Sequence, residues 1–268
     1  MDDFLDRLGK VLVSLEQSLR INLEPDGSSP YTIVQGSIAR LFRLHNESNQ
    51  LLADFELARL GMFALDLKLI GRKAPELLRQ YRKQLRKIER HESFFGIRFE
   101  VRIAASFLGK GYSITKRESP DFVVTINDES VFLECTSVRF DHSKDRDAVL
   151  YKIGRAVREK VHKRYLCGST ALLIDWTNVC NFAVKYNLMP ESGEIPDYVG
   201  NLEYEGDDPG SVVLFMYYSD VDNETFGMRF HRVDYSGISP TLRIILDDAF
   251  PPNEGFEQSG EKFIPREG

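Results

Sequence analysis

The run from Val131 to Val138 has the composition of a buried β-strand except for the carboxylate of Glu134. Side chains alternate between the two faces of a strand, so Phe132, Glu134 and Thr136 point to one face. Both faces carry apolar residues, which predicts a central strand covered from both sides. A carboxylate there loses hydration worth several kcal/mol unless it is protonated, paired or bound to a metal ion. Glu134 therefore constrains both the fold and the function of the chain.

Two further acids are expected near Glu134. A second predicted strand, Phe122–Ile126, begins directly after Asp121. A helix predicted over Phe94–Leu108 carries Glu100 at the border of its apolar stripe. Hard divalent cations such as Mg²⁺ bind a few carboxylate oxygens together with water, and such an ion polarises a phosphoryl oxygen or activates a water. The three acids are therefore candidate metal ligands.

The order of predicted elements indicates an α/β fold with a central mixed sheet. Residues 1–92 are predicted to form a helical N-terminal region, and residues 93–225 a core. Residues 226–268 are predicted to hold a strand pair, Phe226–Tyr235 and Leu242–Leu246, and an acidic polar tail. The predicted helices span 3–19, 33–45, 51–70, 75–91, 94–108 and 143–165, the predicted strands span 112–116, 122–126, 131–138, 170–177 and 211–219, and residues 186–210 are predicted to be an irregular insertion.

Composition limits the compartment and the partners. The three cysteines form no Cys-x-x-Cys pair, so neither a disulfide framework nor a structural zinc site is expected. The first residues lack the basic segment of a secretory signal, and no apolar run approaches the ~18 residues of a membrane span. We therefore expect a cytoplasmic protein that does not bind a membrane. The net charge is −6, yet residues 1–180 carry 29 bases and 24 acids, so a nucleic-acid partner is not excluded.

The predicted helix 75–91 has a strongly basic side. The residues on that side are Arg79, Arg82, Lys83, Arg86, Lys87 and Arg90. A solvated surface face and a phosphate-binding face both explain such a cluster.

The acidic residues occur in a pattern that resembles a known family. Glu100, then Pro120-Asp121, then Glu134-Cys135-Thr136 are similar to the motif of the PD-(D/E)XK superfamily, the restriction-endonuclease-like nucleases. Those proteins share an αβββαβ core with a helix glutamate, an aspartate after proline, and an acid-x-lysine on the next strand. The resemblance covers about a third of the chain, from Phe94 to Thr177. Its motif is short, and the agreement in element order adds weight to it.

The resemblance implies a function and a set of ligands. It implies a hydrolase that uses Mg²⁺ or Mn²⁺ to cleave phosphodiester bonds, with DNA as a more typical substrate than RNA. By the same resemblance Glu100, Asp121 and Glu134 would hold the metal ion, and the carbonyl group of Cys135 would be an additional ligand.

The chain departs from the family at Thr136, where the motif has lysine. Threonine can hydrogen-bond a water molecule but carries no charge. By resemblance to members whose lysine lies on the following helix, the replacements are Lys152, Lys160 and Lys163. Lys160 is the first choice, because it precedes Val161 of the apolar stripe, and Lys152 is the second. A solvated side chain is the alternative for each lysine.

Each acid also has a structural alternative. Asp121 can cap the turn after proline, Glu134 can pair with Arg139 or a helix lysine, and Glu100 can lie at the rim of the core. The rival to a nuclease is a catalytically inactive module of the same fold that binds nucleic acid or assembles a complex. The helical N-terminal region is the candidate surface for a partner protein or a homo-oligomer. Basic residues that flank the acids and are candidates for phosphate contacts are Arg117, Arg139, Lys144 and Arg146.

Overall fold

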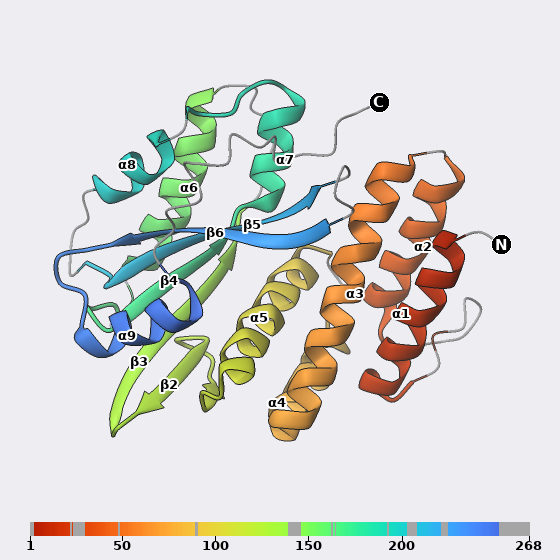
Figure 1. Ribbon diagram of the computed structural model, residues 1–268, viewed down its shortest axis with the longest axis horizontal. Coiled ribbons are helices and arrows are strands. Elements are labelled where there is room, and N and C mark those ends of the chain that lie inside the picture. The colour runs from red at the N-terminus through yellow and green to blue at the C-terminus, as the bar shows by residue number, and fades with distance from the viewer. Residues whose placement is uncertain are drawn as a thin grey trace. The chain divides into compact units, whose positions relative to one another are not determined.

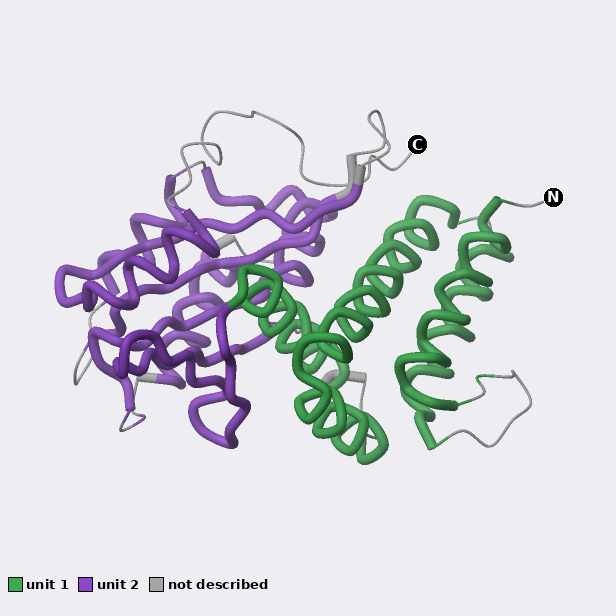
Figure 2. Tube along the Cα trace, turned by 60° about the horizontal axis from the view of Figure 1, so that its bottom comes forward, with its two compact units in different colours: residues 1–111, 265–268 green, residues 112–264 purple. Residues whose placement is uncertain are grey.

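The computed structural model of the protein (Figure 1) describes residues 3–21, 23, 30–47, 49–88, 91–138, 146–161, 163, 165–191, 193–202, 208–220 and 225–251. The chain divides into two compact units, with the boundary between Gly111 and Tyr112 (Figure 2). The first unit is helical, and the second contains the sheet. The helix that carries Glu100 belongs to the helical unit, whereas its sequence predicts that it belongs to the core that begins at residue 93.

The helical unit is organised around one long helix. Its elements are α1 (Asp3–Leu19), α2 (Thr32–Asn46), α3 (Gln50–Lys73), α4 (Pro75–Leu85) and α5 (His91–Lys110). Helix α3 contacts each of the other four and buries Leu57, Leu60, Ala64 and Leu67 at helical spacing. Pro75 opens α4, where its missing N–H costs no hydrogen bond. No helix in the described part of the chain is long and apolar enough to cross a membrane.

The basic side of α4 takes part in packing within this unit. Arg82 donates two hydrogen bonds, of 2.8 and 2.6 Å, to the carbonyl oxygen of Ser18 near the end of α1. Arg86 donates to the hydroxyl group of Tyr31 at 3.1 Å and lies over its ring. Two of the six basic side chains therefore stabilise the helical unit, which favours the structural interpretation of this face.

The second unit is built on one mixed open sheet, so the α/β class is confirmed. Its strands, in spatial order, are β1 (Ile114–Lys116), β2 (Phe122–Ile126), β3 (Glu129–Ser137), β4 (Thr170–Asp175), β5 (Ser211–Asp220) and β6 (Thr225–Asp234). β1, β2 and β3 pair antiparallel, β3, β4 and β5 pair parallel, and β6 returns antiparallel to β5. Asn127 and Asp128 both have positive φ and form the tight turn between β2 and β3.

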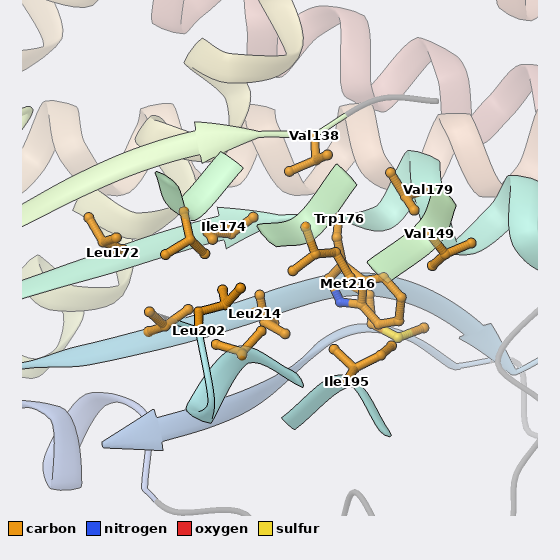
Figure 3. Close-up of a cluster of buried hydrophobic side chains, with 14 of the residues drawn as sticks. Val138, Val149, Leu172, Ile174, Trp176, Val179, Ile195, Leu202, Leu214 and Met216 are labelled. Atoms are coloured by element: carbon orange, nitrogen blue, oxygen red, sulfur yellow. The ribbon is translucent and has the colours of Figure 1, made fainter. Parts of the chain in front are cut away.

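Helices cover one face of this sheet and enclose its core. These are α6 (Arg146–Val161), α7 (Thr177–Lys185) and α8 (Glu194–Gly200), which lie together above the strands in Figure 1. A buried cluster joins Leu172 and Ile174 of β4 and Leu214 of β5 to Val149 of α6 and to Trp176 (Figure 3). Every residue of β4 is buried, as expected of a parallel strand covered on both faces.

The predicted C-terminal strand pair is wrong. Residues 242–246 lie in a helix, α9 (Pro240–Ala249), and β6 belongs to the main sheet. The helix follows from Ser239-Pro240, a capping residue before a proline, and from the helical spacing of Leu242, Ile245 and Leu246. Helices α7 and α8 were also not predicted, and α8 lies inside the segment expected to be irregular. The acidic tail lies outside the described residues from residue 252 onward.

Asp66 should make the stability of the helical unit depend on pH. Its carboxylate on α3 is buried and accepts a hydrogen bond from Arg102 of α5 at 2.8 Å. Burial raises the pKa of Asp66 to about 7, although the charge and hydrogen bond of Arg102 lower it. An unfolded Asp has a pKa of about 3.9, so the native state binds the proton more tightly between these values. The free energy of unfolding should therefore fall as pH rises from about 4 to 7, by at most about 1.4 kcal/mol per pH unit.

Urea denaturation at a series of pH values tests this. Asp66→Asn should flatten the dependence in that window, whereas Asp6→Asn, at an exposed position on α1, should keep it. If Asp66→Asn retains the slope of the parent protein, another group is responsible.

The cap of α9 should stabilise the sheet unit. Ser239 Oγ accepts a hydrogen bond from the backbone N–H of Leu242 at 3.2 Å. Ser239→Ala should lower the free energy of unfolding by about 1 kcal/mol, measured by urea denaturation. Ser236→Ala, in the exposed turn just before, should change it by less than about 0.5 kcal/mol. Equal effects of the two variants would show that the cap contributes nothing.

Candidate functional site

Glu134 lies in the middle of the sheet unit with both carboxylate oxygens hydrogen-bonded. It is 5% exposed on β3, on the face covered by α6. Oε1 accepts a hydrogen bond from Lys160 Nζ at 2.6 Å, and Oε2 accepts one from the Tyr165 hydroxyl at 2.6 Å. Two strong donors therefore compensate the desolvation of this carboxylate.

Lys160 reaches the strand from the last turn of α6. Its side chain is 25% exposed, so the ammonium group is partly screened from water. Burial lowers the pKa of Lys160, but the hydrogen bond and charge of Glu134, with the charge of Asp121, outweigh burial and raise that pKa. Lys160 is therefore a cation at neutral pH, held between two acids.

Asp121 lies directly before β2, opposite Glu134. The antiparallel register pairs Phe122 with Leu133, and one further step of that register brings Asp121 to Glu134. Asp121 Oδ2 accepts a hydrogen bond from the backbone N–H of Cys135 at 2.7 Å. Its carboxylate therefore lies at the edge of β3, within electrostatic range of the same lysine as Glu134.

The backbone of Cys135 faces the same edge. The N–H groups of Phe132 and Val138 donate to carbonyl oxygens of Ser169 and Asp175, so even-numbered positions of β3 face β4. The N–H and C=O groups of one strand residue point to the same side. The Cys135 carbonyl is consequently directed toward the side of the strand on which Asp121 lies.

Tyr165 belongs to the site and is not among the residues predicted from the sequence. Its half-buried hydroxyl donates to Glu134, and burial, followed by the bond to Glu134, raises the pKa of Tyr165 despite an opposing hydrogen bond with Ser119. The hydroxyl group of Thr170 donates to the Tyr165 carbonyl at 2.6 Å and fixes its backbone. The helix predicted over residues 143–165 ends at Val161, so Tyr165 lies beyond α6, and no family motif marks its position.

The other lysine candidates and Thr136 differ in position from Lys160. Thr136 is half-buried two residues after Glu134, on the same strand face. Lys152 precedes Lys160 by eight residues on α6, about 12 Å along the helix axis. Lys163 is exposed. Of the three lysines, the one hydrogen-bonded to Glu134 is thus Lys160.

The remaining predicted residues belong to the helical unit, have no described contact with this group, or lie outside the described chain. Glu100 is half-buried on α5 in the helical unit, and its participation in a shared site stays a prediction. Arg117 is exposed before β2. Arg139 and Lys144 lie outside the described residues, as does the side chain of Arg146.

The oxygen atoms of Asp121, Glu134 and Cys135 are of the type that binds a divalent metal ion. Within the described ranges, no group of three or more His, Cys, Asp or Glu side chains is arranged to hold a metal ion. Asp121 and Glu134 supply two carboxylates, and the Cys135 carbonyl is a third oxygen directed to the same edge. Magnesium is typically bound by one or two carboxylates, with waters and substrate phosphates completing the shell. The residues present fit such an ion, and its binding stays a prediction.

Comparisons with known proteins add no relative to this description. No family model matches the chain, and searches of curated proteins and of solved structures found no match either. Interpretation of the site therefore depends on its residues and geometry.

Proposed function

We propose that the protein is a metal-dependent nuclease of the restriction-endonuclease-like type that hydrolyses phosphodiester bonds, with DNA as its substrate. The observation that carries the proposal is the 2.6 Å hydrogen bond between Lys160 and Glu134, beside Asp121. An acid pair with an adjacent ammonium group supplies the three charges that this hydrolysis uses. The lysine missing at residue 136 is then replaced by one from α6.

The topology supports the same proposal. The elements α5, β1, β2, β3, α6 and β4 follow one another in the order αβββαβ. Three antiparallel strands are followed by a helix and a fourth strand parallel to the third. Asp121 lies at the start of the second strand and Glu134 within the third, as in the family motif.

The residues would divide the work as follows. Asp121, Glu134 and the Cys135 carbonyl would hold Mg²⁺ or Mn²⁺, which supplies Lewis-acid polarisation of the scissile phosphate and a more acidic water. Lys160 would orient the attacking water and stabilise the negative charge that develops on the phosphoryl oxygens. Tyr165 would hold the Glu134 carboxylate in position through Oε2.

A second candidate function is a catalytically inactive module that binds nucleic acid or assembles a complex. The observation in its favour is that Lys160 and Tyr165 already occupy both oxygens of Glu134. Such an arrangement stabilises the fold without any metal ion. A partner protein or a second copy bound through the helical unit would suit this alternative.

Cleavage assays separate the two functions. Mixed DNA and RNA substrates are incubated with Mg²⁺, Mn²⁺ or EDTA, and the parent protein should cleave DNA only with a divalent ion. Lys160→Ala should lower the cleavage rate by about 10²-fold or more, the usual size of an electrostatic or acid–base contribution. DNA affinity should fall far less, because one phosphate contact among many is lost.

Arg155→Ala is the matched control, since it removes an exposed cation from the same helix. Lys152→Ala tests the second lysine candidate in the same assay. If the parent protein cleaves and Lys160→Ala cleaves as fast, the role assigned to Lys160 is wrong. If the parent never cleaves with any divalent ion, the inactive module is the better description.

Metal binding tests the ligand set independently of cleavage. Mn²⁺ affinity, measured by calorimetry, should fall at least about tenfold in Glu134→Gln, because a charged ligand is lost. Tyr165→Phe should also lower the affinity, by less than Glu134→Gln does, since the carboxylate ligand loses the hydrogen bond that holds it in position. Tyr151→Phe, at an exposed position on α6, should leave it unchanged. Equal Mn²⁺ affinity of the parent protein and Glu134→Gln would remove Glu134 from the ligand set.

A further inference from the structure

The solvent-facing side of α4 concentrates positive charge. Between residues 75 and 88 the chain has one acid, Glu76, and five bases, which are Arg79, Arg82, Lys83, Arg86 and Lys87. The bases recur at intervals of three or four residues, so they share one side of the helix. All of them are exposed except Arg82, which is half-buried. They extend over eight residues, about 12 Å along the helix axis.

Contacts with the end of α1 hold two of these arginines in place. Arg82 donates both of its hydrogen bonds to the carbonyl oxygen of Ser18. Arg86 donates to the hydroxyl group of Tyr31, which in turn donates to the carbonyl oxygen of Leu19 at 3.3 Å. Carbonyl groups at the end of a helix lack helical partners and carry partial negative charge, so they attract these cations. The packing of α1 against α4 therefore fixes the two arginines.

The end of α1 adds a sixth cation, Arg20, which is exposed. Burial lowers the pKa of Arg82, and the charge of Arg20 is the largest electrostatic contribution that lowers it further. The charges of Arg86 and Arg79 act in the same direction, against that of Tyr31. The cations therefore lie close enough to repel one another. We call the surface formed by Arg20 and the five bases of α4 the basic face.

Little of this charge is compensated by acids within the described residues. Glu76 pairs with Arg79 at 2.7 Å. No acid in the described part of the chain pairs with Arg20, Lys83 or Lys87. Packing thus accounts for two arginines of the basic face but not for these three exposed cations. Clustered like charges destabilise a free protein, and a bound polyanion would remove that repulsion.

The form of the basic face favours nucleic acid over a membrane surface. Helices that bind membranes insert apolar side chains between the lipids, whereas the apolar side chains of α4 are buried in the helical unit, namely Leu77, Leu78, Tyr81 and Leu85. Phosphates succeed one another about every 3.4 Å along the axis of a DNA strand, so the 12 Å of basic helix matches a run of about three or four phosphates.

We propose that the basic face binds the phosphate backbone of a nucleic acid, with Arg20, Lys83 and Lys87 as the contacting side chains. Ammonium and guanidinium groups bind phosphate oxygens without reading the bases, so the binding is independent of sequence. The basic face lies in the helical unit and needs no metal ion. The proposal therefore holds for a nuclease and for a catalytically inactive module alike.

Fluorescence anisotropy of a labelled DNA duplex of mixed sequence, titrated with the full chain in EDTA, measures this binding without cleavage. The double variant Lys83→Ala/Lys87→Ala should weaken binding by at least about tenfold, because two phosphate contacts are lost. Between about 50 and 200 mM KCl, its plot of log K against log salt concentration should be shallower by about 1.8, at ~0.9 for each lost contact. A change in folding alone would not reduce this slope by that amount.

Two further double variants serve as controls. Lys10→Ala/Lys68→Ala removes the same charge from exposed positions on α1 and α3, outside the basic face, and should bind DNA nearly as the parent does. Replacing Lys83 and Lys87 by arginine keeps the charge and should also retain the affinity.

The parent protein should bind an RNA duplex as well, since the contacts are to phosphates, and should not bind phosphatidylserine vesicles. Equal weakening by the two alanine double variants, an unchanged salt slope, or binding to vesicles but to neither duplex would each overturn the proposal. A parent protein that binds DNA through the basic face without ever cleaving it supports this proposal and contradicts only the nuclease.

Discussion

The hydrogen-bonded ion pair between Lys160 and Glu134 is the interaction on which the sheet unit depends most. A lone carboxylate at that depth on a central strand would destabilise the fold by several kcal/mol. The hydrogen bonds from Lys160 and Tyr165 prevent this. They require that β3, the end of α6 and the segment that holds Tyr165 keep fixed positions relative to one another. The charges proposed for catalysis are thus also needed for packing. A protein of this design loses stability and activity together when the pair is broken.

Helical and strand phase, together with the family resemblance, predicted part of the geometry around Glu134. The apolar alternation around Glu134 indicated a strand covered on both faces, and the middle of β3, residues 133–135, is buried. The stripe on α6 placed Lys160 at its inner edge, and its ammonium group lies against Glu134. The position of Asp121 before β2 brought it opposite that glutamate. Periodicity along single elements gave the strand face of Glu134 and the helix edge of Lys160, whereas the choice of this helix as the source of a lysine came from the resemblance to the nuclease family.

The features that sequence could not supply depend on chain segments without periodicity, or on longer-range packing. Tyr165 reaches Glu134 from a loop whose path is determined by tertiary contacts such as that with Thr170. The segment 242–246 is short and apolar enough to suit either a strand or a helix, and the cap at Ser239 decides it. Helix α5, which carries Glu100, packs against α3 and so belongs to the helical unit. The spacing of residues along α5 alone does not indicate this packing.

Strand β2 is shorter than its neighbour β3, and this difference leaves part of one edge of β3 unpaired with β2. Its pairing with β3 ends at Phe122 opposite Leu133. β3 continues to Ser137, so its last four residues have no backbone partner on the β2 side among the described pairs. At Cys135 an aspartate side chain takes the place of a strand neighbour. If β2 paired with β3 for two more residues, backbone carbonyl groups would occupy the place of the Asp121 carboxylate, and this edge of β3 would be covered. Because β2 is short, the edge of β3 at Cys135 is open to the side chain of Asp121.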